Sequence, residues 1–216
     1  YFKYHPIHKD TDMKKKLLLG IFAAFVTIID TSAQQLPRAR MNSIFPAGAQ
    51  QGTIVDVTIT GIDLDGSKQL FFSQKGITAV PKKDDKDKVI ANQYTITIAK
   101  NVPVGVYDVQ VGGGHFGISN VRAFAIGDLP EEKSTAGASP DKAMDVKLGT
   151  TINGQASSRN YSYFKVNLKK GQRILVECQA ADIDSKMAPV LVLKDSNCLL
   201  YTSDAADEGL GVDLGG

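Results

Sequence analysis

The stretch that decides the fold is Gly52–Gly61, which reads GTIVDVTITG. Its side chains alternate strictly, with Val55, Val57 and Ile59 on one face and mostly polar residues on the other. A period of two is typical of a strand with one buried face, because successive side chains of a strand point to opposite sides. The stretch therefore predicts a β-strand that turns its valine face toward a core.

Four further stretches of the same half of the chain carry strand signals, either as alternation or as a short apolar run. Turns rich in glycine and aspartate separate them, and no window after Ile29 has a helical period. They are Lys68–Gln74, Gln93–Ala99, Gly105–Gly113 and Ile118–Gly127. In the last of them the inward face is ambiguous. The pattern predicts an all-β protein built on a small antiparallel β-sandwich.

Length and composition set the first limits on function. The chain has 216 residues, enough for one or two domains. Its 43% apolar and 22% charged residues are those of a globular chain, and disorder throughout is excluded. The net charge of +2 gives no argument for binding nucleic acid.

The N-terminal region has the layout of a secretory signal peptide. Three lysines follow Met13, and the apolar run Leu17–Ile29 is too short to span a bilayer. Small residues near Ala33 fit a cleavage site that would leave Gln34 first. We expect a signal peptide helix over 13–33 and an exported protein, in the periplasm, at the cell surface or secreted. Membrane contact would come only through this signal, with a retained anchor as the alternative.

Residues 1–12 precede that signal and are out of place for a terminal signal peptide. We expect them to be a segment assigned too far upstream of the true start at Met13. They contain His5 and His8, so the mature chain would keep only His115. A site built on two histidines of this chain is then excluded.

The second half of the chain begins with a polar segment that contains prolines and small residues. Residues 128–145 therefore predict an interdomain linker. Residues 146–197 are again rich in strand signals and predict part of a second β-sandwich. In its expected strand over Ile174–Ala180, Cys178 takes an inward position, as a buried small side chain would.

Residues 38–127 resemble an IPT/TIG-type immunoglobulin-like domain. The likeness rests on SIFPAGAQQGTIVDVTITGIDLDG, where a proline and two glycines precede a strand that ends in TITG, and on GISNVRAFAIG near the end. The resemblance implies an immunoglobulin-like β-sandwich that binds or spaces other domains.

Residues 146–197 resemble the first part of a bacterial pre-peptidase C-terminal domain, a jelly-roll-like β-sandwich. The matching positions are Asn153, Gly154, Tyr163, Phe164, Gly171, Pro189, Leu191, Leu193 and Asp195. Some members of that family bind calcium through acidic residues ahead of the Tyr-Phe pair. Here that region reads SSRNYSYF and has no carboxylate, whereas calcium prefers several. We expect no calcium there.

The last nineteen residues, 198–216, resemble a translated sequencing adapter in two blocks, CLLYTSDAADE and VDLGG, held in frame. We expect this segment to be an artefact that follows Asn197. A disulfide between Cys178 and Cys198 is then not expected.

Two pairs of carboxylates are the candidate metal ligands. Asp63 and Asp65 share one turn, and Asp182 and Asp184 share another. Aspartates beside glycine or serine usually serve turns, and we expect that role here, with weak calcium binding as the alternative. We expect the charge run 82–88 to be a solvated hairpin loop.

No set of residues predicts a catalytic site or a cofactor. There is no G-x-S-x-G sequence, and the glycine-rich stretch VGGGHFG lacks the lysine of a phosphate loop. We expect VGGGHFG to be a turn with positive φ angles. The sequence is typical of a non-catalytic binding, adhesion or spacer module of a larger bacterial envelope or secreted protein. Its partner would be polysaccharide or protein at the cell surface. The alternative is an accessory N-terminal region of a secreted, peptidase-like hydrolase.

Overall fold

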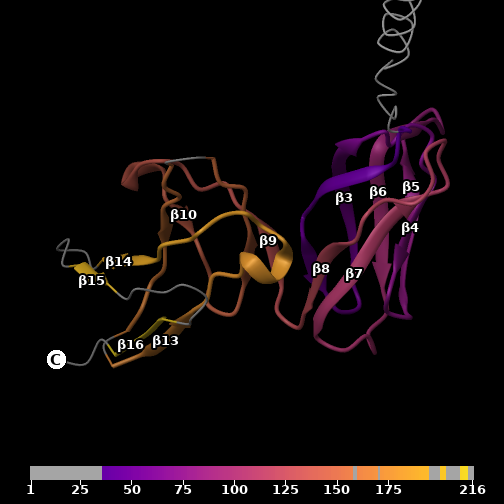
Figure 1. Ribbon diagram of the computed structural model, residues 1–216. Coiled ribbons are helices and arrows are strands. Elements are labelled where there is room, and N and C mark those ends of the chain that lie inside the picture. The colour runs from indigo at the N-terminus through magenta and orange to yellow at the C-terminus, as the bar shows by residue number, and fades with distance from the viewer. Residues whose placement is uncertain (1–35, 158–159, 170, 195–199, 203–209, 214–216) are drawn as a thin grey trace, which may run out of the picture. The chain divides into compact units, whose positions relative to one another are not determined.

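The first half of the chain forms a β-sandwich of two four-stranded sheets in the computed structural model (Figure 1). The structure describes residues 36–157, 160–169, 171–194, 200–202 and 210–213. The strands of this first sandwich are β1 Arg40–Phe45, β2 Gly48–Gln50, β3 Ile54–Ile62, β4 Gln69–Phe72, β5 Ile77–Lys83, β6 Val89–Ile98, β7 Gly105–Gly112 and β8 Arg122–Gly127.

The strand order is that of an immunoglobulin-like sandwich. One sheet has the order β1-β3-β6-β5 and the other β2-β8-β7-β4. The first sheet thus follows the A-B-E-D order of that fold, and β4, β7 and β8 take the places of C, F and G. All neighbours are antiparallel except β2 and β8, which are parallel. The all-β sandwich predicted from the sequence is confirmed.

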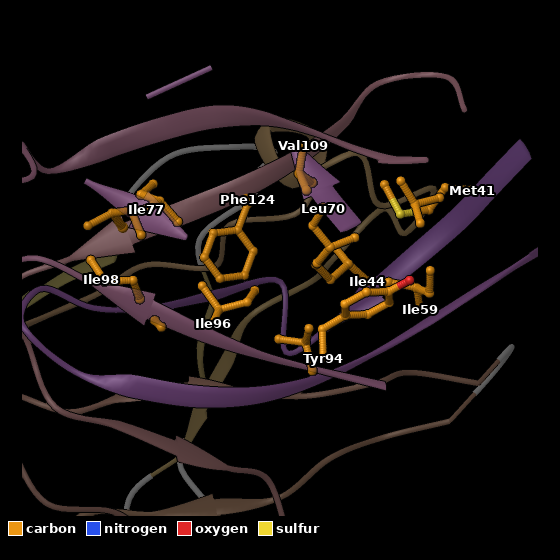
Figure 2. Close-up of a cluster of buried hydrophobic side chains, with 14 of the residues drawn as sticks. Met41, Ile44, Ile59, Leu70, Ile77, Tyr94, Ile96, Ile98, Val109 and Phe124 are labelled. Carbon is orange, nitrogen blue, oxygen red and sulfur yellow. The ribbon is translucent and has the colours of Figure 1, made fainter. Parts of the chain in front are cut away.

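The inward faces of the two sheets form one buried apolar core (Figure 2). The alternation predicted for β3 is confirmed, since Val57 and Ile59 are buried while Ile54 is exposed. In β6 the buried positions are Tyr94, Ile96 and Ile98, also as predicted. Strands β7 and β8 supply the opposite side of the core with Val109, Val111, Phe124 and Ile126. The core excludes water because the two period-two patterns face each other.

The structure resolves the ambiguous face of the stretch Ile118–Gly127. Phe124 and Ile126 point inward, but the strand begins only at Arg122, and Ile118 is exposed. Before the strand, Ser119 is buried and Asn120 bonds to the backbone of β1. The expected strand is therefore shorter, because side-chain hydrogen bonds replace the ladder over its first residues.

The charge run 82–88 covers the end of β5 and the loop of the hairpin between β5 and β6. The Asp84 carboxylate accepts hydrogen bonds from the backbone N–H groups of Lys86 and Lys88, each at 2.9 Å. Asp87 has a φ of 62° and pairs with Lys83 at 2.8 Å. The loop residues 84–88 form an exposed turn, as predicted, and Asp84 and Asp87 make their hydrogen bonds within the hairpin.

The segment expected as a linker contains secondary structure. Strand β9, Glu131–Lys133, pairs with β11, Thr151–Asn153, and β10, Met144–Asp145, pairs with β12, Phe164–Lys165. Both pairs are parallel. Burial raises the pKa of Glu131, although a hydrogen bond from the Asn153 amide at 2.6 Å opposes that shift. Polar composition predicted an interdomain linker over 128–145, and the structure places two short strands within that segment.

The rest of this second block, taken as residues 128–213, is also made of short strand pairs. The elements are η1 Pro140–Lys142, β13 Arg173–Val176, η2 Ala181–Ile183, β14 Val192–Lys194, β15 Leu200–Thr202 and β16 Leu210–Asp213. Strand β13 pairs with β16, and β14 with β15. The segment expected to be adapter-encoded therefore supplies two of the strands. Because backbone pairing does not depend on side chains, the adapter interpretation stays a prediction.

The second block has little buried apolar surface among its described residues. Ala180 is the one hydrophobic residue there that is buried, whereas Tyr161, Leu175 and Val190 are each about two-thirds exposed or more. Two-stranded sheets without a core are marginally stable in water. The first sandwich is therefore the part of the described chain that carries the stability of a packed core.

Candidate functional site

The turn that holds Asp63 and Asp65 is interlocked with the glycine-rich turn after β7. The backbone N–H of His115 donates to the carbonyl oxygen of Asp65 at 3.2 Å. A Cβ at Gly114 would lie 2.6 Å from that same oxygen, so only glycine allows this approach. The ring of His115 covers Gly66, which has a φ of 71°. The two turns thus hold each other through backbone contacts.

The aspartates of this first turn have the conformations of turn residues. Asp63 is half-buried with a φ of 54°, a left-handed conformation that aspartate tolerates, and Asp65 is exposed. The glycine-rich turn has the positive φ angles that its sequence predicted, 78° at Gly113 and 82° at Gly117. This end of the sandwich is shaped by backbone geometry.

The second candidate pair lies at helix η2, and within the part of the chain that the structure describes, Asp184 is the member that makes a hydrogen bond. Asp182 is exposed within η2. Asp184, which ends η2 with a φ of 57°, accepts a hydrogen bond from the Ala123 N–H at 2.7 Å. Its carboxylate also lies 3.8 Å from the Arg122 guanidinium. The structure therefore uses Asp184 as a contact to β8.

Taken together, the four carboxylates are not assembled into a multidentate centre. Within the described ranges, no three His, Cys, Asp or Glu residues are placed to hold a metal ion. Calcium takes six to eight oxygen ligands, and each of these turns offers two side-chain carboxylates. Weak calcium binding thus gains no geometric support.

Three other predicted positions have different outcomes. The expected strand of Cys178 ends at Val176, so the cysteine follows the strand and is half-buried. Cys198 lies outside the described residues, so the disulfide is not tested. The cleavage site at Ala33 and Gln34 also lies outside them, as does the whole signal peptide.

A surface that the sequence did not single out lies on the outer side of the sheet β1-β3-β6-β5. We call it the hydroxyl face, and it consists of Ser43, Thr58, Thr60, Thr78, Thr95 and Thr97. Thr97 pairs across strands with Thr78, and Ser43 with Thr60. The Ser43 and Thr60 hydroxyls lie 2.7 Å apart and share a hydrogen bond. All six are exposed except Thr95, which is half-buried.

An ion pair lies within the hydroxyl face. The Asp56 carboxylate accepts hydrogen bonds from the Lys82 ammonium and the Thr95 hydroxyl, each at 2.6 Å. The hydrogen bond from Lys82 is the main cause that lowers the pKa of Asp56, and the bond from Thr95 adds to it. Lys133, whose ammonium lies 5.9 Å from the centre of the Phe45 ring, adds a smaller electrostatic contribution. Asp56 is thus held ionised in a fixed position.

The ion pair could not be identified from sequence alone, although a partial signal existed. Asp56 takes an outward position in an alternating strand, and Lys82 and Thr95 lie 26 and 39 residues away along the chain. Only the pairing of β3 with β6 and of β6 with β5 brings them together. The sequence predicted that Asp56 points outward, and the register of the strands determines that Lys82 and Thr95 are its partners.

We expect Asp56→Asn to lower the stability of the first sandwich modestly, by at most about 1 kcal/mol near pH 7, because exposed ion pairs contribute little. A carboxylate with a lowered folded-state pKa stabilises the fold above its unfolded pKa, and that stabilisation is lost as the pH falls through the folded value. The difference between wild type and variant should therefore vanish at acid pH, below the range in which an ordinary aspartate titrates. Urea unfolding at several pH values measures it, and a difference independent of pH would contradict the prediction.

Comparison with known proteins gave no match, so the class of this protein is defined by its fold. No known family, no curated protein and no solved structure matched this chain. Among the described residues, no helix is long and apolar enough to cross a membrane. The class that the structure itself defines is an all-β protein with an immunoglobulin-like sandwich.

Proposed function

We propose that the chain is a non-catalytic module of an exported bacterial protein, and that it binds neutral polysaccharide on the hydroxyl face. The observation that carries this proposal is the uncovered sheet surface of serine and threonine hydroxyls around a fixed Asp56. The signal-like N-terminal sequence supports export, and the resemblance of residues 38–127 to IPT/TIG-type domains supports a binding role.

The chemistry of the hydroxyl face favours a sugar polymer as ligand. Hydroxyl groups both donate and accept hydrogen bonds, as the hydroxyls of sugars do. Asp56 and Lys82 balance each other in charge, so the centre of the face does not favour a charged polymer. Neighbouring strands lie about 4.8 Å apart, which gives a regular surface for an extended chain.

A protein partner is less favoured by the same surface. The cores of protein interfaces are enriched in aromatic residues, methionine and arginine. On this face Ile54 and Val80 are exposed, and strand β6 separates them. Val80 lies opposite Thr95, and Ile54 lies opposite Thr97. The face therefore offers many weak polar contacts and few apolar anchors.

The test is affinity electrophoresis of the full chain in gels that contain cellulose derivative, mannan or dextran. We expect retardation in at least one gel. A triple variant, Thr58→Val, Thr60→Val and Thr97→Val, should lose at least about tenfold in affinity, because each lost hydrogen bond contributes about 1 kcal/mol. Valine keeps the β-branched shape, so the strands should be preserved.

Thr135→Val is the matched control, since Thr135 is exposed outside the sheet. It should bind as the wild type does. Wild-type protein that passes all three gels unretarded would contradict the proposal, and so would a triple variant that binds unchanged.

A further inference from the structure

The edge of β8 has a gap beside its first residues. The Ala125 N–H donates to the carbonyl oxygen of Ala47 at 2.8 Å, on the side where β2 runs alongside β8. Along a strand, N–H groups two residues apart point to the same side. The Ala123 N–H therefore points toward β2 as well, but the β2 pairing starts only at Gly48 opposite Ala125. Among the described residues, no strand pairs with Ala123 on that side.

The gap arises where the chain passes from one sheet to the other. Strand β1 ends at Phe45 in the first sheet, and β2 begins at Gly48 in the second. Arg122 covers part of this passage, because its guanidinium donates to the carbonyl oxygen of Asn42. An exposed N–H on a sheet edge is a place where another chain segment can pair.

A tight turn of the second block fills the gap. Its backbone closes on itself, since the N–H groups of Ile183 and Ser185 both donate to the carbonyl oxygen of Ala180. Asp184 takes a φ of 57° at the end of this turn, and its carboxylate receives the Ala123 N–H at 2.7 Å. Ala180, at the start of the turn, is buried.

We infer that the β8 edge at Ala123 is a docking site and that its occupant is the turn 180–185 of the same chain. Both segments belong to the compact unit Pro37–Gly216. The carboxylate completes the hydrogen bonding of an edge strand and is close enough to Arg122 for electrostatic attraction. The Asp184 carboxylate thus makes both of the polar contacts that the described residues show between this turn and β8.

Amide exchange measured by NMR on the full chain tests this inference. Asp184→Gly removes the acceptor without backbone strain, since glycine accepts the left-handed conformation. We expect exchange of the Ala123 amide to become at least about tenfold faster, the factor that one net hydrogen bond accounts for. The Ala125 amide, bonded within the sandwich, should keep its wild-type rate.

Two further variants make the result specific. Asp184→Asn keeps a weaker, uncharged acceptor and should raise the Ala123 rate less than the glycine variant does. Asp182→Asn changes the exposed neighbour and should leave the rate unchanged. The inference is overturned if the Ala123 amide exchanges equally in wild type and Asp184→Gly. It is also overturned if Asp182→Asn has the same effect as the Asp184 variants.

Discussion

Replacing Phe124 by alanine is expected to destabilise the first sandwich by about 3–5 kcal/mol. The Phe124 side chain is fully buried among the core residues (Figure 2). Its ring meets the Phe72 ring edge to face, with 5.6 Å between the ring centres. Alanine loses both the transfer free energy of the ring and the contacts of the atoms around the cavity. Because small domains are stable by about 5–15 kcal/mol, this loss is a large fraction of the total.

Urea unfolding followed by circular dichroism measures the change. Phe71→Ala is the matched control, since Phe71 is the residue before Phe72 in β4 and its side chain points to the exposed side. We expect the control to cost less than half as much as the core variant. Equal losses at the two positions would contradict the assignment of Phe124 to the centre of the core.

Much of the first sandwich could be predicted because each strand is specified by the alternation of its own residues. A strand with one buried face must alternate, and the stretches around Val57, Ile96 and Val109 show that alternation without help from other parts of the chain. Glycine-rich turns were predictable for the same reason, since positive φ angles select glycine at positions such as Gly113. In these strands the alternation indicates which side faces inward, whereas in the stretch Ile118–Gly127 it did not.

What could not be predicted depends on contacts between residues far apart in sequence. The partners of Asp56 and the acceptor for the Ala123 N–H are set by sheet register and by a turn 61 residues away. The sequence around Asp184 predicted a turn, but nothing in it indicated which strand Asp184 would contact. The segment 128–145 is a further example, because its polar composition gave no signal for two short strands whose partners lie later in the chain.

The stretch Ser119–Asn120 also shows how a non-local role changes an interpretation. In sequence it read as the start of a strand. In the structure the Ser119 hydroxyl accepts the Val111 N–H at 3.0 Å and donates to the Asn120 carbonyl oxygen at 2.8 Å. The buried serine thereby supplies an acceptor for a backbone N–H of β7 and holds Asn120 in position beside β1. Ser119 and Asn120 therefore link the sheet that contains β7 to the sheet that contains β1 through hydrogen bonds.

Asn120→Ala is expected to destabilise the first sandwich by about 2–3 kcal/mol. The Asn120 amide accepts the Met41 N–H at 2.9 Å and donates to the Met41 carbonyl oxygen at 3.1 Å, so it pairs with β1 as a strand would. The β1–β3 register shifts between Met41 and Ser43, and Met41 itself is fully buried. Alanine leaves two backbone groups without partners, and an unsatisfied buried group costs about 1–3 kcal/mol.

The same unfolding measurement, with two companion variants, separates this role from a general effect of losing an asparagine. Asn120→Asp keeps an acceptor for the Met41 N–H but loses the donor, so it should fall between wild type and alanine. Asn101→Ala, at an exposed turn position, should change stability by no more than about 0.5 kcal/mol. If Asn120→Ala also stays within that limit, the two bonds to Met41 do not fasten β1.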